Sequence, residues 1–150
     1  MRGGKGEPAW RRWKRHPRRH RDWESRLVAY LEAASDRPHA YGRHDCLMFC
    51  AAAIEAQTGR DFAEGHRGAY RSAAGAARYL KRLGFRSIEE LLDSVLSERP
   101  VAFARRGDIV LADGIPGLCI GGEALFVGQE GAREGLVRRP RSEWQKAWAV

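Results

Sequence analysis

The sequence predicts an α+β domain, in which helices from the N-terminal half pack on a small antiparallel sheet from the C-terminal half. Up to about residue 96, apolar residues recur at helical spacing. After Pro100, short apolar runs alternate with glycine-containing turns, a pattern typical of strands. The length of 150 residues and the hydrophobic content of 43% suit one domain with one core.

Four helices are expected in the first half, over residues 22–35, 46 to about 58, roughly 67–83 and 87–96. In the first, Trp23, Leu27 and Leu31 share one face. The second is apolar nearly all round, which places it in the middle of the core. The third is expected to turn its apolar residues inward. The fourth begins at Ser87, with Glu90 in the capping-box position.

Strands are expected over residues 108–112, 118–120, 124–127 and 135–138. Gly121, Gly122 and Glu123 separate the second strand from the third, and this composition predicts a hairpin turn. The last segment, residues 144–150, is expected to start as a helix and to end as an edge strand.

Residues 1–21 form a basic arm ahead of a domain predicted to span residues 22–150. The chain has a net charge of +8, and residues 1–26 carry nearly all of it, with ten Arg or Lys against three acidic residues. The candidate partner-binding residues of the arm are Trp10, Arg11, Arg12, Trp13, Arg18 and Arg19. Arginine and tryptophan are enriched in protein interfaces, but they also bind nucleic acid or anionic surfaces. A solvated, disordered arm is the alternative.

The sequence gives no sign of a membrane span, a signal peptide or a metal site. No apolar run reaches the roughly 20 residues that a spanning helix needs. The charged N-terminus has no apolar stretch behind it, so synthesis in the cytoplasm is expected. Cys46, Cys50 and Cys119 do not resemble a disulfide framework, and they lack the second ligand pair of a structural zinc site. We expect no metal and no cofactor.

Cys46 is the candidate catalytic residue. It follows Asp45, an expected N-cap, and opens the second helix. The helix dipole and the free backbone N–H groups of the first turn favour a thiolate, the nucleophilic form. Arg43 and His44 act in the same direction and Asp45 opposes them. The alternative is that Cys46 simply fills space at a helix start.

The order of three motifs resembles that of a known superfamily. Asp45-Cys46 opens a helix, residues 105–110 (RRGDIV) turn into the first strand, and residues 117–121 (GLCIG) form the second. Over residues 22–150 this resembles the NlpC-type cell-wall cysteine peptidases, which have a papain-like fold. The chain is most similar to a related family of small phage and prophage proteins whose genes lie among tail genes.

The resemblance implies that Cys46 is the nucleophile and that Gly107-Asp108 is a structural turn. It also implies a histidine base at the start of the second strand, where this chain has Ile115, and no histidine follows His66. The third, orienting polar residue has no clear counterpart. A cysteine hydrolase needs a base within reach of its thiol, and His39, His44 and His66 are the remaining candidates near Cys46.

Two classes of function follow from this comparison. The first is a structural or assembly component of a phage-like tail tip or baseplate, with a degenerate active site, other tail proteins as partners and a final location in the virion. The second is a peptidoglycan-degrading cysteine hydrolase that uses Cys46. A weaker third is a nucleic-acid-binding protein that acts through the basic arm.

Overall fold

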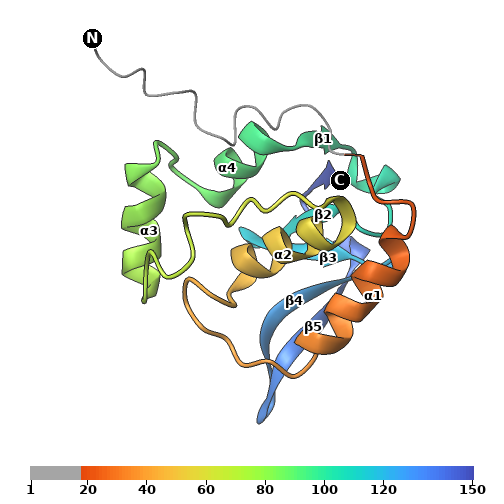
Figure 1. Ribbon diagram of the computed structural model, residues 1–150, viewed down its shortest axis with the longest axis horizontal. Coiled ribbons are helices and arrows are strands. Elements are labelled where there is room, and N and C mark those ends of the chain that lie inside the picture. Colours follow the sequence, from red (N-terminus) through yellow and green to blue (C-terminus); the bar gives the residue numbers. More distant parts are fainter. Residues whose placement is uncertain (1–17) are drawn as a thin grey trace.

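The computed structural model describes residues 18–150, so Trp10, Arg11, Arg12 and Trp13 of the arm lie outside the described part of the chain. Within it, helices precede strands, which confirms the predicted α+β class (Figure 1). The helices are α1 (Trp23–Ala34), α2 (Cys46–Thr58), α3 (Ala73–Arg82) and α4 (Ile88–Val95). The strands are β1 (Ser97–Arg99), β2 (Ile109–Ala112), β3 (Ile115–Cys119), β4 (Glu123–Glu130), β5 (Arg133–Pro140) and β6 (Lys146–Ala149).

The six strands form one antiparallel sheet in the order β1-β6-β2-β3-β4-β5. The segment 144–150 does end as a strand, β6, but its predicted helical start and its predicted edge position are both wrong. A 3-10 turn (Arg141–Glu143) precedes Trp144, and β6 lies inside the sheet between β1 and β2. The reason is β1, a short polar strand that covers the outer side of β6, with Ser97 opposite Ala149.

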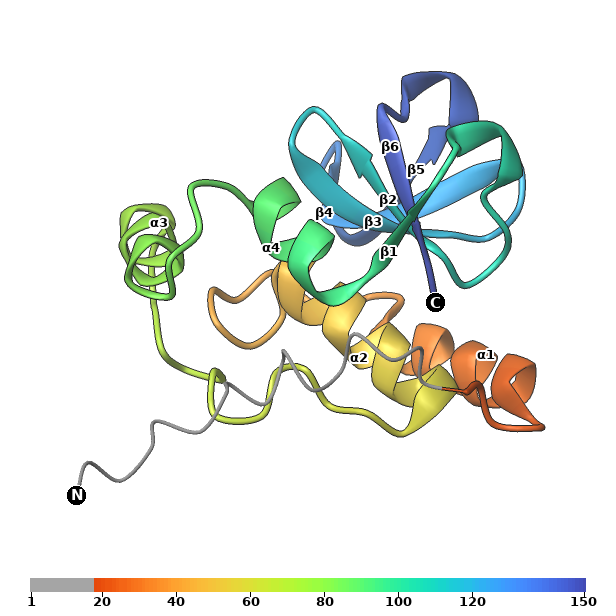
Figure 2. The same ribbon diagram turned by 90° about the horizontal axis from the view of Figure 1, so that it is seen from above.

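One face of the sheet carries the main core. In Figure 2, α1 and α2 lie along this face. Phe49 of α2 and Leu27 of α1 are fully buried against Ile109, Leu118 and Trp148 of the sheet. The predicted all-round apolar helix therefore does lie in the centre of the core. A second, smaller cluster on the other side of the sheet contains Val110, Phe126 and Trp144.

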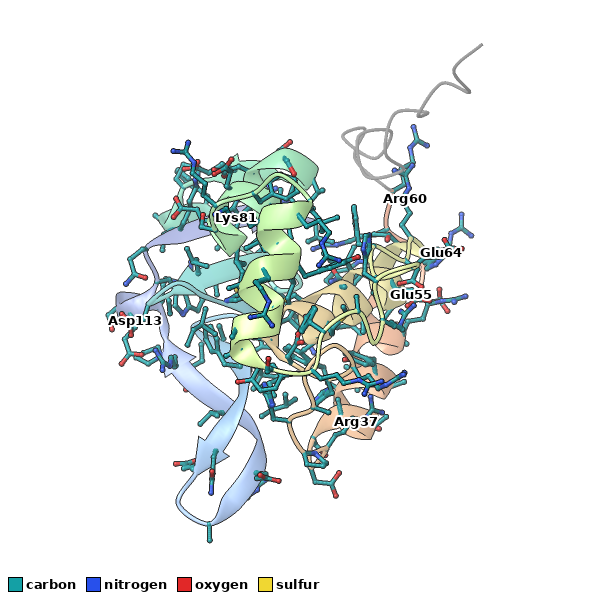
Figure 3. All side chains as sticks on the ribbon, turned by 90° about the vertical axis from the view of Figure 1, so that its left-hand side faces the viewer. Arg37, Glu55, Arg60, Glu64, Lys81 and Asp113 are labelled. Atoms are coloured by element: carbon teal, nitrogen blue, oxygen red, sulfur yellow. The ribbon has the colours of Figure 1, made fainter. Side chains whose placement is uncertain are left out.

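The third helix differs from its prediction at its start and in its burial. It begins at Ala73 because Gly65 and Gly68 have positive φ angles, and because the Ser72 hydroxyl caps it by accepting a hydrogen bond from the Gly75 amide (2.9 Å). None of its residues is buried. It stands at one side of the molecule, away from α1 (Figures 1 and 2), and it is nearest the viewer in Figure 3, where Lys81 is labelled.

A cluster of charges joins α4 to the sheet. The Lys146 ammonium of β6 lies 3.1 Å from the Glu89 carboxylate, 2.8 Å from Asp93 and 3.2 Å from Glu98. Asp93 also accepts a hydrogen bond from the Trp148 indole (2.9 Å). Because Trp148 is fully buried, this bond joins α4 to the core.

Candidate functional site

Asp45 organises the start of α2. Its carboxylate accepts hydrogen bonds from the Met48 amide (2.9 Å) and the Gly42 amide (2.8 Å), so it caps the helix as predicted. It also accepts a bond from the Tyr70 hydroxyl (2.6 Å). Asp45 and Tyr70 are both buried, so this contact links the loop before α3 to the N-terminus of α2.

Cys46 is the first residue of α2, as the sequence predicts, but its thiol is not activated. Burial is the main cause that raises its pKa to about 11, and the Asp45 charge adds to the shift. Backbone N–H groups at the helix start act in the opposite direction and are outweighed. At neutral pH the thiol is therefore protonated and a poor nucleophile.

None of the described histidines is hydrogen-bonded to the Cys46 sulfur. His39 and His66 line the same groove as Cys46. The His66 Nδ1 is hydrogen-bonded to the Tyr79 hydroxyl, and burial lowers the pKa of the His66 ring. The His39 ring meets Tyr41 edge-on, with 4.5 Å between the ring centres. The thiol of Cys46 and the imidazoles of His39 and His66 thus line one groove, but neither imidazole is hydrogen-bonded to the thiol.

His44, the histidine nearest to Cys46 in the sequence, points elsewhere. It is buried and meets Phe49 edge-on, and it does not line the groove. Its Nε2 has no hydrogen-bond partner among residues 18–150, and burial lowers the pKa of the ring. His44 is therefore a neutral core residue in this structure.

Ile115 is the residue at the position of the expected base. It starts β3 opposite Ala112 and is 37% exposed. It does not line the groove beside Cys46, whose lining residues all come from residues 39–95. The groove is therefore formed by the helical half, whereas the resemblance places a base on the sheet.

The groove itself is large and mostly apolar. It has a volume of about 400 Å³ and lies among α2, α3, α4 and the loop before α3. We call it the apolar groove. Its lining includes Cys46 and Ala51 of α2, Ala77 and Leu80 of α3, and Leu91 and Val95 of α4. Its size is in the range of small-molecule sites.

Asp108 is the buried charge of the second half. It is fully buried, and its carboxylate accepts hydrogen bonds from the Arg99 guanidinium (2.8 Å) and the backbone amides of Arg105 (2.8 Å) and Val150 (3.1 Å). The Arg19 guanidinium lies 3.6 Å from it. The Gly107-Asp108 turn thus ties both ends of the described chain to the sheet.

The two described candidate residues of the arm lie differently. Arg18 is exposed. Arg19 folds back on the domain: it donates to the Gln57 side chain (3.0 Å) and lies 4.0 Å from the ring centre of Trp23. The His20 amide donates to the Gln57 carbonyl (2.7 Å). Residues 19 and 20, which the sequence assigns to the arm, therefore pack on the domain.

We expect iodoacetamide to alkylate Cys46 slowly at pH 7 and progressively faster beyond pH 9, because only the thiolate reacts and the pKa is about 11. Asp45→Asn keeps an N-cap acceptor but removes the charge, so it should lower this pKa and speed the reaction. Mass spectrometry of the labelled peptides separates Cys46 from the buried Cys50 and Cys119. A rate that reaches its plateau below pH 8 would contradict the raised pKa.

The described residues were also compared with the requirements of a metal site and of a membrane-spanning helix. Within residues 18–150, no group of three or more His, Cys, Asp or Glu side chains is placed to hold a metal ion. No helix in that range is long and apolar enough to cross a membrane.

Comparison with known proteins places the chain in a family. Residues 18–150 match the family described as a domain of unknown function (DUF6950), so the chain belongs to that family. The match begins at residue 18, which is also the first residue that the structure describes. No curated protein matches the chain.

Proposed function

We propose that this protein is a structural or assembly component of a phage or phage-like tail, built on an NlpC-type, papain-like domain with a degenerate active site. The order of the motifs supports the papain-like fold in this proposal. Asp45-Cys46 starts a buried helix, and the Gly107-Asp108 turn leads into an antiparallel sheet. In this proposal the arm binds other tail proteins, and the particle is the final location of the chain.

The state of Cys46 is the observation that carries the proposal. Its pKa is raised to about 11, and no described histidine or carboxylate is hydrogen-bonded to its sulfur. A cysteine hydrolase requires the reverse, a lowered thiol pKa and a base within hydrogen-bond reach. Ile115 at the position of the expected base agrees with a domain retained for binding.

We expect residues 1–17 of the arm to be required for assembly and dispensable for folding. A chain lacking residues 1–17 keeps Arg19 and its contacts with Gln57 and Asp108, so its thermal unfolding midpoint should stay unchanged. Its incorporation into purified tail particles, measured by quantitative mass spectrometry, should fall strongly, because Trp10 and Trp13 are absent. Cys46→Ala is the control and should incorporate normally. Normal incorporation of the truncated chain would contradict the proposal that the arm binds other tail proteins.

A peptidoglycan-degrading cysteine hydrolase is the second candidate, and one observation favours it. Cys46 lines an open groove together with His39 and His66, so a movement of the loop before α3 is able to change the distance between thiol and imidazole. Hydrogen bonds in catalytic sites often tighten only in the presence of substrate. In this candidate, peptidoglycan is the substrate and Cys46 attacks an acyl carbon of its peptide.

A further inference from the structure

A second hollow adjoins the apolar groove. It has a volume of about 310 Å³ and is lined by Arg71, Arg78 and Arg82. We call it the cationic hollow. Tyr70 and Tyr79 line both spaces, with 5.9 Å between their ring centres. An apolar space and a positively charged space therefore share one wall.

The helix α3 produces this arrangement through its two faces. Ala77 and Leu80 lie on the side that lines the apolar groove, whereas Arg78 and Arg82 line the cationic hollow. Tyr79 lies between these two sides around the helix. Because no residue of α3 is buried, the apolar side of the helix remains accessible from the groove.

The charge of the cationic hollow is uncompensated. Arg71, Arg78 and Arg82 are exposed, and none of them forms an ion pair with any residue in the range 18–150. No acidic residue occurs between Glu64 and Glu89. Three guanidinium groups without an acidic partner favour an anionic ligand, since arginine matches carboxylate and phosphate geometry.

We infer that α3 forms a binding site for an anionic amphiphile, with the aliphatic chain in the apolar groove and a phosphate or carboxylate head in the cationic hollow. The chain would bury the apolar sides of α2, α3 and α4 that the fold leaves accessible. The head would cross the rim formed by Tyr70 and Tyr79 to reach the arginines. This site needs neither a reactive Cys46 nor the tail assignment.

The test uses the full chain and dodecyl phosphate below its critical micelle concentration, with binding measured by calorimetry. We expect one molecule to bind per chain. Dodecyl maltoside, which has the same tail and a neutral head, and inorganic phosphate, which has no tail, should each bind at least about tenfold more weakly, because one of the two contacts is absent. Dodecanoate tests the carboxylate head, and the tighter of the two anionic amphiphiles identifies the preferred head group.

Two variants locate the site. Ala77→Trp places an indole in the apolar groove from an exposed helix position, so it should weaken dodecyl phosphate binding by about tenfold or more. Arg78→Gln with Arg82→Gln should weaken it by roughly tenfold, through lost charged hydrogen bonds. Arg133→Gln, a single replacement of the same kind at an exposed arginine at the start of β5, should leave the affinity unchanged.

A measurement on the unmodified chain gives an independent check. Because Cys46 lines the apolar groove, saturating dodecyl phosphate should slow its alkylation at pH 9. The site is refuted if dodecyl phosphate does not bind, or if it binds Ala77→Trp and wild type equally. It is also refuted if dodecyl maltoside binds as tightly, or if Cys46 is alkylated at the same rate with and without the ligand.

Discussion

Replacing Asp108 by alanine is expected to lower the free energy of unfolding by about 3–5 kcal/mol, the usual cost of removing one partner from a buried ion pair. The Arg99 guanidinium and the backbone amides of Arg105 and Val150 would lose an acceptor that is fully buried. Arg19 would also lose the charge that offsets its partial burial. Urea unfolding followed by tryptophan fluorescence measures the loss.

Asp113→Asn, which removes the charge of an exposed ion pair, is the control for Asp108→Ala. Asp113 also pairs with an arginine, Arg139, at 3.1 Å, but its side chain is 77% exposed. An exposed pair contributes only about 0–1 kcal/mol, so this change should be nearly silent. Equal losses at the two positions would show that burial of Asp108 does not have the role described for it.

Replacing Asp45 by alanine is expected to cost about 2–4 kcal/mol, from a lost helix cap and an unsatisfied buried hydroxyl. Three donors depend on this carboxylate: the amides of Gly42 and Met48, and the Tyr70 hydroxyl. The variant should also loosen the loop before α3, because Tyr70 holds that loop to α2. Hydrogen exchange of the loop amides, together with urea unfolding, measures both effects.

Two controls separate the loss of the helix cap from the loss of the contact with Tyr70 in Asp45→Ala. Tyr70→Phe removes only the hydroxyl that donates to Asp45. Ser87→Ala removes an exposed N-cap, whose oxygen accepts from the Glu90 amide (3.1 Å), and should cost about 1 kcal/mol. A loss for Asp45→Ala no larger than for Ser87→Ala would mean that Asp45 is an ordinary cap without a link to the loop.

The helices that contain local signals are the ones that the sequence predicts well. Asp45 and Gly59 mark the start and end of α2, and both have the expected capping geometry in the structure. Ser87 likewise starts α4, with its oxygen accepting from the Glu90 amide. These elements are predictable because their caps involve residues that lie three or four positions apart.

The elements that depend on distant partners are not predictable in this way. Nothing in the three polar residues of β1 indicates a strand, and they are extended because they pair with β6, about 50 residues later. The lack of buried residues in α3 also depends on distant parts of the chain. Its apolar spacing correctly predicts a helix with one apolar face, but whether that face is packed depends on α2 and α4.

The candidate site also combines features that depend on neighbouring residues with features that depend on distant ones. The position of Cys46 at a helix start follows from the residues beside it, whereas the direction of its pKa shift depends mainly on burial by residues far away in the sequence. The contact of Arg19 with Asp108 joins residues that are far apart in the sequence. The sequence shows Arg78 and Arg82 on one helix and Arg71 just before it, but the groove beside them depends on residues of α2 and α4 that are distant in the sequence.

The most direct test of the account is the release of soluble muropeptides from purified peptidoglycan by the full chain, with Cys46→Ala as the matched variant. Since the Cys46 pKa is about 11 and no described base is bonded to the thiol, wild type and variant should give the same background release at pH 7. Release by the wild type that disappears in Cys46→Ala would show that Cys46 is a working nucleophile, and it would contradict the proposal of a degenerate site.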